Sequence, residues 1–390
     1  MYISRLAVDH YRSWESLVLD LEPGVNILLG PNGLGKTNLV EAVELLSTGS
    51  SHRVSSSAPL VQRGQNKATV RANAQSEGQT TTYEVTVPLR GANRGRINGG
   101  SSLYMRDLVG QIPSVTFSPE DQRLVTGDPG GRRSFINQSA SQLDPSYYQL
   151  KQNVSHIAQQ RGALLKQLSR AQERADSGSQ ANNEAALSTL EVWTGEFIRL
   201  GMELTARRMR LIEQLQDPLQ TIYRQLAGSD QEVALTYQPS FEEVVQSGVS
   251  QESAALISQH FQRIYPGELA RGQNLIGPQR DDIAFILNSM DAKDYASNGE
   301  EWTLALALRL AEYQLLTQAN GVQPILVLDD VFAQLDPDRR SQILNFAQSQ
   351  DQVLITVAAA SDVPELDSAH LVDLARLAQV HRERLEEIHL

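Results

Sequence analysis

The sequence contains no cysteine among its 390 residues. Disulfide bonds, thiolate metal sites and a cysteine nucleophile are therefore excluded, and the composition fits a cytoplasmic protein. Histidine is also scarce. Its seven copies show no paired spacing typical of metal ligands, and they stand at positions 10, 52, 156, 260, 370, 381 and 389. We therefore expect chemistry that uses neither thiols nor an imidazole-held metal.

Long apolar segments are also missing. The best candidate, VLITVAAA at 353–360, has only the length of a strand, and no basic-then-apolar leader opens the sequence. We therefore expect no membrane span and a cytoplasmic location. The hydrophobic fraction of 41% is ordinary for a globular protein, and 390 residues usually fold as two or more lobes.

Lysine is scarce among the charged residues, with only five copies in 34 basic residues. The formal net charge of −12 argues against a protein that binds nucleic acid over its whole surface. The charge is uneven, however, because residues 1–145 carry a balance of +1 and the remaining 245 carry −13. A local basic face on the first part of the chain is therefore compatible with DNA binding.

The stretch LLGPNGLGKTNL, residues 28–39, fits the pattern G-x-x-x-x-G-K-[ST]. The apolar run 25–29 before it predicts a buried strand, and the periodic residues after it predict a helix that stops at Gly49. This setting favours a phosphate-binding loop over an ordinary glycine turn. The loop consists of Gly30, Pro31, Asn32, Gly33, Leu34, Gly35, Lys36 and Thr37. Its backbone N–H groups and Lys36 would hold the phosphates of ATP, and Thr37 would ligate Mg²⁺.

A second predicted strand, 325–328, ends in two acidic residues. We expect Asp329 to bind Mg²⁺ directly or through water, at the carboxyl edge of a parallel sheet. Asp330 would orient or deprotonate the attacking water. An acid pair of this kind can also form a structural turn, but the phosphate-binding loop favours the metal site.

Ser297 and Glu300 form a capping-box pattern at the start of a predicted helix. An ordinary helix cap explains this pattern as well as a functional role does. The functional alternative is a second phosphate-binding surface, which would face the nucleotide held by another copy of the chain.

The middle of the chain predicts two antiparallel helices that form a short arm. Apolar residues recur at Leu150, Val154, Ile157, Leu164, Leu168 and Ala171, and again at Leu190, Trp193, Phe197, Leu200, Leu204 and Leu211. The polar segment 175–186 predicts the turn between them. A helical hairpin packed on a head is the favoured interpretation, and an arm that docks a partner is the alternative.

Arginines cluster in the predicted hairpin 87–100, which contains Arg90, Arg94 and Arg96. Solvated charge and contact with DNA phosphates are equally compatible with this pattern. Arg132 and Arg133 are a second candidate pair. No row of aromatic residues interleaves with these arginines, so the pattern favours sequence-independent backbone binding over base stacking.

Several further segments accompany these motifs in order from residue 1 to about 365. They are SRLAVDHYRSWE, SHRVSS, TFSPEDQRLVTGDPGGRRSFIN, QQRGALLKQ, GPQRDDI, YASNGEEWTLALALRLAE and LVLDDVFAQLD. Together they resemble the RecF family of bacterial recombination mediators, whose ATPase head is of the ABC type and akin to that of SMC proteins. The resemblance implies an ABC signature at 297–301, which includes Ser297 and Gly299. It also implies a D-loop at 333–336 and a Q-loop-like segment at 118–121.

The resemblance further implies a weak, DNA-stimulated ATPase that forms ATP-dependent homodimers on double-stranded and gapped DNA. RecO and RecR would be its partners in loading the recombinase during DNA repair, replication restart and the SOS response. Four positions depart from the commonest family pattern: Gln279, Glu300, Glu301 and Asn137. The strand at 353–360 is also followed by no switch histidine.

We therefore predict an α/β fold, with an ABC-type P-loop head and an inserted, mainly helical lobe. The expected parts are 1–145 with the P-loop and arginine hairpin, 146–270 as the helical lobe, and 271–390 with the signature and the acidic strand. A transporter ATPase subunit is disfavoured by the helical arm and the 261 positions between Lys36 and Ser297. A structural SMC-like protein is disfavoured because the arm is too short for a long coiled coil.

Overall fold

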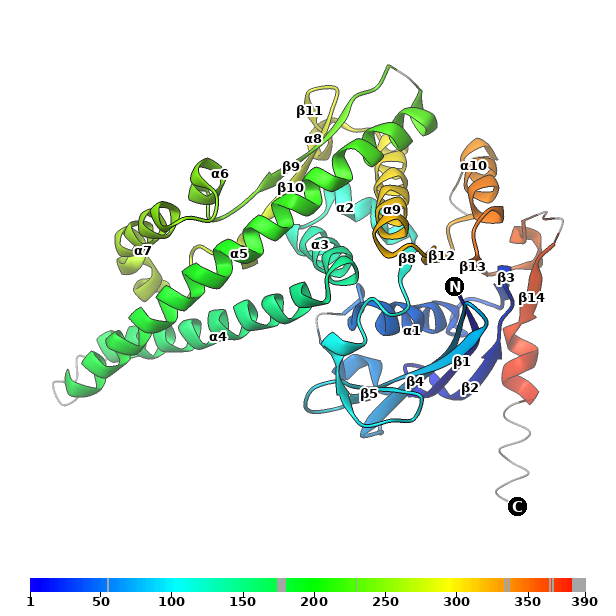
Figure 1. Ribbon diagram of the computed structural model, residues 1–390, viewed down its shortest axis with the longest axis horizontal. Coiled ribbons are helices and arrows are strands. Elements are labelled where there is room, and N and C mark those ends of the chain that lie inside the picture. The colour runs from blue at the N-terminus through cyan, green and yellow to red at the C-terminus, as the bar shows by residue number, and fades with distance from the viewer. Residues whose placement is uncertain are drawn as a thin grey trace.

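The structure, a computed structural model, describes residues 1–54, 56–173, 180–228, 230–332, 335, 337–364, 366 and 368–380. Figure 1 shows a head that contains two large sheets and an elongated helical arm that projects to one side. Within these described ranges, no helix combines the length and the apolar character needed to cross a bilayer.

A parallel five-stranded sheet forms the centre of the head, in the order β14-β3-β13-β12-β8. Its strands are β3 (Gly24–Leu29), β8 (Ser114–Phe117), β12 (Ile325–Asp329), β13 (Gln352–Val357) and β14 (His370–Asp373). Both β12 and β13 are buried along their whole length, as expected for a parallel sheet covered on both faces. The three predicted strands near 25–29, 325–328 and 353–360 are thus confirmed.

A second, antiparallel sheet has the order β2-β1-β4-β5-β6-β7. Its strands are β1 (Tyr2–Tyr11), β2 (Trp14–Asp20), β4 (Lys67–Ser76), β5 (Gln79–Pro88), β6 (Arg94–Ile97) and β7 (Leu103–Tyr104). Helix α1 (Lys36–Thr48) is buried between the two sheets. Its residues Leu39 and Val43 share one apolar cluster with Val70 of the antiparallel sheet and Val327 of the parallel sheet.

Helix α9 (Asn298–Asn320) covers the opposite face of the parallel sheet. Trp302 and Leu306 pack with Leu326 and Ile355, which alternate along their strands with residues that face α1. Helix α10 (Pro337–Gln348) adds Ile343 to this cluster. The parallel sheet is therefore held between α1 on one face and α9 with α10 on the other.

The arm is built from α4 (Pro145–Glu173), α5 (Gln180–Ala227) and α7 (Gln251–Arg271). The predicted helical pair is confirmed, with two differences. Leu165 rather than Leu164 is fully buried, and residues 180–186 of the predicted turn belong to α5, while 175–179 lie outside the described residues. A small sheet at the base of the arm was not predicted. It contains β9 (Val233–Gln238), β10 (Asp282–Leu287) and β11 (Met290–Asp291).

Short elements complete the described fold. The helices are α2 (Arg123–Thr126), α3 (Pro129–Leu143), α6 (Glu243–Ser247) and α8 (Ala292–Tyr295). The 3₁₀ turns are η1 (Ala58–Leu60), η2 (Met105–Asp107), η3 (Pro119–Gln122), η4 (Pro278–Arg280) and η6 (Ala360–Asp362).

Buried ion pairs tie the arm together. Arg161 of α4 forms a bidentate pair with Glu268 of α7, at 2.9 and 2.6 Å. Arg208 of α5 donates to Asp281 Oδ2 at 2.9 Å, and Asp281, which is 0% exposed, also accepts from Tyr237. Because an unpaired buried charge is strongly unfavourable, each of these pairs fixes how its elements pack.

We expect Asp281→Ala to lower the free energy of unfolding by about 3–5 kcal/mol, since it leaves Arg208 buried without a carboxylate. Urea denaturation measures this change. Glu196→Ala is the matched control, because Glu196 pairs with Arg199 on the exposed face of α5. This substitution should lower the free energy of unfolding by less than about 1 kcal/mol. Equal, small effects of both substitutions would contradict the anchoring role of Asp281.

Candidate functional site

The predicted phosphate-binding loop connects β3 to α1, and its glycines are required by the backbone. Gly33 and Gly35 have φ angles of +82° and +105°, in the left-handed region that favours glycine. A Cβ atom on Gly35 would lie 2.5 Å from Ser13 Oγ and 2.8 Å from Trp14 Nε1. Trp14 Nε1 donates to the Gly35 carbonyl at 3.0 Å. The turn between β1 and β2 therefore packs directly against the loop at Gly35 and leaves no room for a side chain there.

Lys36 is a buried cation without a carboxylate partner among the described residues. Its side chain is 5% exposed, and Nζ donates to Gly30 O at 2.7 Å, to Pro31 O at 3.4 Å and to Asn32 Oδ1 at 3.4 Å. These acceptors are neutral, so the ammonium charge is not compensated. The free N–H groups at the start of α1 add further positive potential. The loop therefore fits an anion such as a phosphate.

Asp329 and Thr37 bring two oxygen ligands together at the carboxyl edge of the parallel sheet. Thr37 Oγ1 lies 3.3 Å from Asp329 Oδ1, and Thr356 Oγ1 of β13 donates to the same atom at 2.6 Å. Asp329 is 6% exposed, and this burial raises its pKa above the ordinary value despite the two hydrogen bonds. A buried carboxylate beside a hydroxyl fits Mg²⁺, an ion that completes its coordination with phosphate oxygens and water.

Two oxygen ligands alone do not complete the coordination of a magnesium ion. Within the described ranges, no group of three or more histidine, aspartate or glutamate side chains is placed to hold a metal ion alone. Thr37 and Asp329 would supply two of the oxygens around such an ion.

Asp330 follows Asp329 in an unusual backbone conformation. Its φ angle is +55°, and its N–H donates to Thr356 Oγ1 at 2.9 Å. A left-handed conformation at a residue other than glycine costs free energy, and such residues concentrate at functional sites. The chain thus leaves the strand direction at the second acid of the pair.

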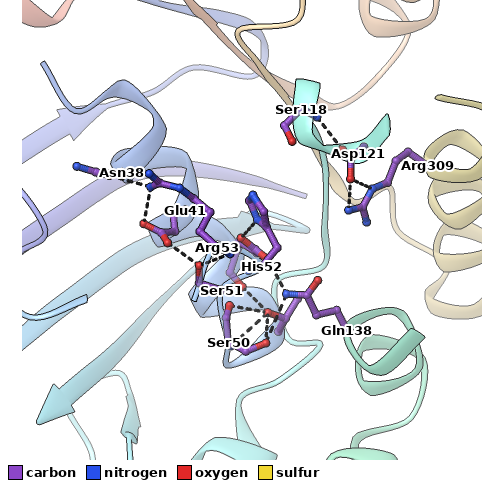
Figure 2. Close-up of polar contacts among 12 residues, drawn as sticks. Asn38, Glu41, Ser50, Ser51, His52, Arg53, Ser118, Asp121, Gln138 and Arg309 are labelled. Atoms are coloured by element: carbon purple, nitrogen blue, oxygen red, sulfur yellow. Dashed lines mark hydrogen bonds and ion pairs between the residues drawn. The ribbon is translucent and has the colours of Figure 1, made fainter. Parts of the chain in front are cut away.

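A polar network beside the loop was missed by the sequence analysis. Arg12 Nε and Arg53 Nη1 both donate to Glu41 Oε2, at 2.8 and 3.2 Å. Arg53 Nη1 also donates to Asn38 Oδ1 at 3.0 Å (Figure 2). The segment SHRVSS could have indicated this network, because it places an arginine shortly after the helix that follows the loop. Its Ser55 lies outside the described residues.

A second acid of α1, Glu44, connects the loop helix to α3. His52 Nδ1 lies 2.7 Å from Glu44 Oε2, and Gln138 Nε2 donates to Glu44 Oε1 at 2.6 Å. Burial alone would lower the pKa of His52, but the carboxylate of Glu44 outweighs it and the pKa of His52 is raised. These contacts fix α1 against the base of the arm.

Ser297 caps α9 as predicted. Its N–H donates to Glu300 Oε2 at 2.8 Å, its Oγ accepts from the Glu300 N–H, and its hydrogen bonds lower the pKa of Glu300. Figure 1 shows that α9 begins beside α8 and β11, far from α1. The structure therefore does not bring Ser297 or Gly299 to the P-loop of the same chain.

The predicted Q-loop-like segment contacts α9, the helix that follows the predicted signature. Ser118 caps η3 through Asp121, whose Oδ1 accepts from Arg309 Nη2 of α9 at 2.6 Å (Figure 2). Gln122 Nε2 donates to Glu301 Oε2 at 2.8 Å. The segment after β8 thus contacts α9 at two places, at Glu301 near the start of the helix and at Arg309 near its middle. Of the predicted D-loop, 333–336, only Leu335 belongs to the described residues.

The candidate DNA-binding arginines separate into two groups. Arg90, Arg94 and Arg96 are exposed on the predicted hairpin, which β5 and β6 form. Arg132 is 3% exposed and forms a bidentate pair with Asp282, at 2.6 and 2.9 Å. The structure therefore contradicts its assignment to DNA phosphates.

Arg133 is neither as exposed as the hairpin arginines nor as buried as Arg132. Its side chain is half-buried and donates to the Asp281 carbonyl at 2.8 Å. Burial, together with the positive charge of nearby Arg208, lowers its pKa. Contact between Arg133 and DNA remains a prediction.

Comparison with known proteins agrees with this arrangement. Residues 2–377 match a family described as the RecF/RecN/SMC N-terminal domain. A protein of Bifidobacterium adolescentis named DNA replication and repair protein RecF is 59% identical over 383 residues, which cover 98% of this chain and 93% of that protein. A protein of the same name from Beutenbergia cavernae is 42% identical and is covered to 96%.

A solved structure has the same fold. It is described as the recombination mediator protein RecF with ATP in the RecFOR pathway, and it superimposes with a TM-score of 0.81 at 26% identity, with 96% of each chain covered. The head is thus an ABC-type ATPase fold, as predicted. Because both the family match and the close relatives span nearly the whole sequence, the chain belongs to the RecF family.

Proposed function

We propose that this protein is an ATP-dependent DNA-binding ATPase of DNA repair and replication restart, with ATP and Mg²⁺ as cofactors. One observation carries the proposal. An uncompensated buried lysine and a buried carboxylate–hydroxyl pair meet at the carboxyl edge of one parallel sheet, at the ends of β3 and β12. This is where open α/β sheets bind ligands, and its charges match a nucleotide with its metal.

Each residue has a distinct part in the proposed reaction. Lys36 moves from the loop carbonyls to the β- and γ-phosphates, and the N–H groups at the start of α1 hold the remaining phosphate oxygens. Thr37 and Asp329 would hold Mg²⁺, which supplies charge neutralisation at the phosphates when it is bound. Asp330 orients the attacking water and accepts its proton.

The site is completed by a second copy of the chain. Ser297 and Gly299 stand at a helix N-terminus that is suited to a phosphate, yet this end of α9 lies far from α1 of the same chain. A head-to-head homodimer would place them against the γ-phosphate held by the partner. ATP would then join two heads, and hydrolysis would separate them.

The DNA-repair role rests on the relatives. Those reported above are named DNA replication and repair proteins, and the structural match is described as part of the RecFOR pathway. We extend this role to the present chain, with double-stranded and gapped DNA as the ligand and RecO and RecR as partners. A weak, DNA-stimulated ATPase in the cytoplasm fits this role, and the exposed hairpin arginines Arg90, Arg94 and Arg96 are its first DNA contacts.

Lys36→Ala tests the nucleotide site. The substitution removes one charge-assisted contact to phosphate, which contributes about 1.5–3 kcal/mol, so ATP affinity should fall roughly ten- to hundredfold. Isothermal titration calorimetry measures the affinity, and thermal melting checks the fold. Lys166→Ala on the exposed surface of α4 is the matched control. Unchanged ATP binding by Lys36→Ala would remove the loop from the mechanism.

Asp330→Asn separates binding from hydrolysis. The amide keeps the size of the side chain but does not accept a proton, so turnover should fall by about 10²–10⁴ while ATP binding persists. Dimers should then accumulate on DNA, which analytical ultracentrifugation with labelled DNA detects. If the variant hydrolyses ATP at the normal rate, the general base is another residue.

Ser297→Asp distinguishes a helix cap from a contact with the partner's nucleotide. Aspartate caps helices as well as serine does, so a purely structural Ser297 predicts a mild effect. A carboxylate placed against the γ-phosphate would instead repel it. The variant should then bind ATP normally, fail to dimerise and lose hydrolysis.

Mixing Ser297→Asp with Lys36→Ala protein sharpens this test. A mixed dimer has one site with both substitutions and one with neither, so partial recovery of ATPase activity supports a contact in trans. Normal dimerisation and hydrolysis by Ser297→Asp alone would leave Ser297 as a helix cap only.

A further inference from the structure

A polar groove lies beside the arginine hairpin and apart from the nucleotide site. Its volume is about 480 Å³. The loop after β5 and the segment 104–106 line one side, and helices α3 and α4 line the other. We call it the α4 groove. Its lining includes Tyr104, Arg106, Gln149 and Lys151. No residue of the phosphate-binding loop lines it.

The lining of the α4 groove contains no aspartate or glutamate among the residues that the structure describes. Its two charged members, Arg106 and Lys151, are both cations, and most of the others are serines, asparagines and glutamines. In a chain with 46 acidic residues and a net charge of −12, this surface is unusual. Cations combined with amide and hydroxyl donors are the groups that bind phosphate oxygens.

Lys151 is the least compensated of these cations. It extends from α4 as a half-buried side chain, and no described residue forms an ion pair or hydrogen bond with its Nζ. Burial, followed by repulsion from Arg208, lowers the pKa of Lys151. A bound anion would remove this unfavourable charge balance.

The rim of the groove holds two guanidinium groups on one tyrosine. The Cζ atoms of Arg94 and Arg106 lie 4.2 and 4.8 Å from the centroid of the Tyr104 ring. Arg106 Nη1 also donates to Gln149 Oε1 of α4 at 2.8 Å. Tyr104 is 54% exposed, and its ring helps to hold both guanidinium groups at the rim. The two cations suit the rim to the phosphate backbone of a strand.

We propose that the α4 groove binds the phosphodiester backbone of a DNA strand, with Lys151 inside it and Arg94 and Arg106 at its rim. The proposal rests on the proposed DNA-binding function and adds a location to it. Gly91, Ala92 and Asn93 of the hairpin line the groove directly after the exposed Arg90, so one strand can contact both Arg90 and the groove. A free nucleotide is the other source of phosphate, and the experiment distinguishes the two.

The first experiment measures DNA affinity against salt concentration, with ATP present. Each phosphate contact contributes about 0.9 to the slope of log K against log salt. Lys151→Gln should lower this slope by about that amount, and Lys151→Gln with Arg106→Gln by about twice as much, with unchanged ATP affinity. Lys166→Gln is the control, since it removes the same charge from the same helix outside the groove. Equal slopes for Lys151→Gln and Lys166→Gln would overturn the proposal.

The second experiment uses the scarcity of lysine. Protein labelled with ¹³C at lysine Cε should give five side-chain signals, one for each of the residues 36, 67, 151, 166 and 293. The spectrum of Lys151→Gln assigns the signal of Lys151. We expect this signal to shift when a gapped DNA duplex is added to the ATP-bound protein, and the signal of Lys36 to shift with ATP alone.

The outcomes separate this proposal from the proposed function. If DNA binds while the Lys151 signal stays unchanged, the groove is not a DNA site although the DNA-binding function holds. If inorganic phosphate or AMP shifts the signal and DNA does not, the groove is a small-anion site and the proposal is wrong. If no DNA binds to the wild-type protein with ATP, the proposed function fails and the groove assignment fails with it.

Discussion

The hydroxyl of Thr356 holds the candidate catalytic centre together. It lies on β13, between β3, which leads into the phosphate-binding loop, and β12, which ends in the two acids. Its Oγ1 donates to Asp329 Oδ1 at 2.6 Å and accepts from the Asp330 N–H at 2.9 Å. One side chain therefore orients the proposed metal ligand and stabilises the strained backbone of the proposed base. The parallel sheet supplies this geometry, because the carboxyl ends of β3, β13 and β12 meet at one edge.

A buried charge network joins the segment after β8 and helix α3 to α9, the helix that Ser297 caps. Arg309 of α9 donates to Asp121 at 2.6 Å and to Glu312 at 2.9 Å, and Ser139 of α3 donates to Glu312. Burial raises the pKa of Glu312, and Arg309 opposes this shift. Breaking the ion pair of Arg309 with Asp121 or with Glu312 would leave a buried carboxylate without its cation. The segment after β8 and α9 are therefore expected to move as one unit, to which Ser139 hydrogen-bonds α3. Movement of the predicted signature relative to the phosphate-binding loop would then involve the whole of α9 rather than its first turn.

Local patterns could be predicted from the sequence, whereas contacts between distant segments could not. The phosphate-binding loop, the strand before Asp329 and the cap at Ser297 each depend on residues within about ten positions, so spacing alone indicated them. Arg132 was misassigned because its partner Asp282 lies 150 positions away and only the fold brings them together. The pairing of β9 with β10 and the stacking of Arg94 on Tyr104 were missed for the same reason. Leu165 is fully buried in place of the predicted Leu164, because a hydrophobic repeat does not fix which of two adjacent leucines faces inward.

The acidic net charge is compatible with DNA binding because, in salt, exposed acids repel DNA phosphates only over short distances. At physiological ionic strength exposed charges are screened beyond about 8 Å, so the acids of the arm and of the C-terminal part weaken DNA binding only where they lie close to it. The hairpin and the α4 groove supply Arg90, Arg94, Arg106 and Lys151; no described acid lines the groove, and Asp107 pairs with Arg106 at its rim. A few phosphate contacts on one chain give weak binding, since each contributes little alone. A dimer held by ATP would present two such surfaces to one duplex, and the second would bind at the raised effective concentration that linkage provides. On this view DNA binding depends on ATP because ATP joins two chains, and no contact between nucleotide and DNA is needed.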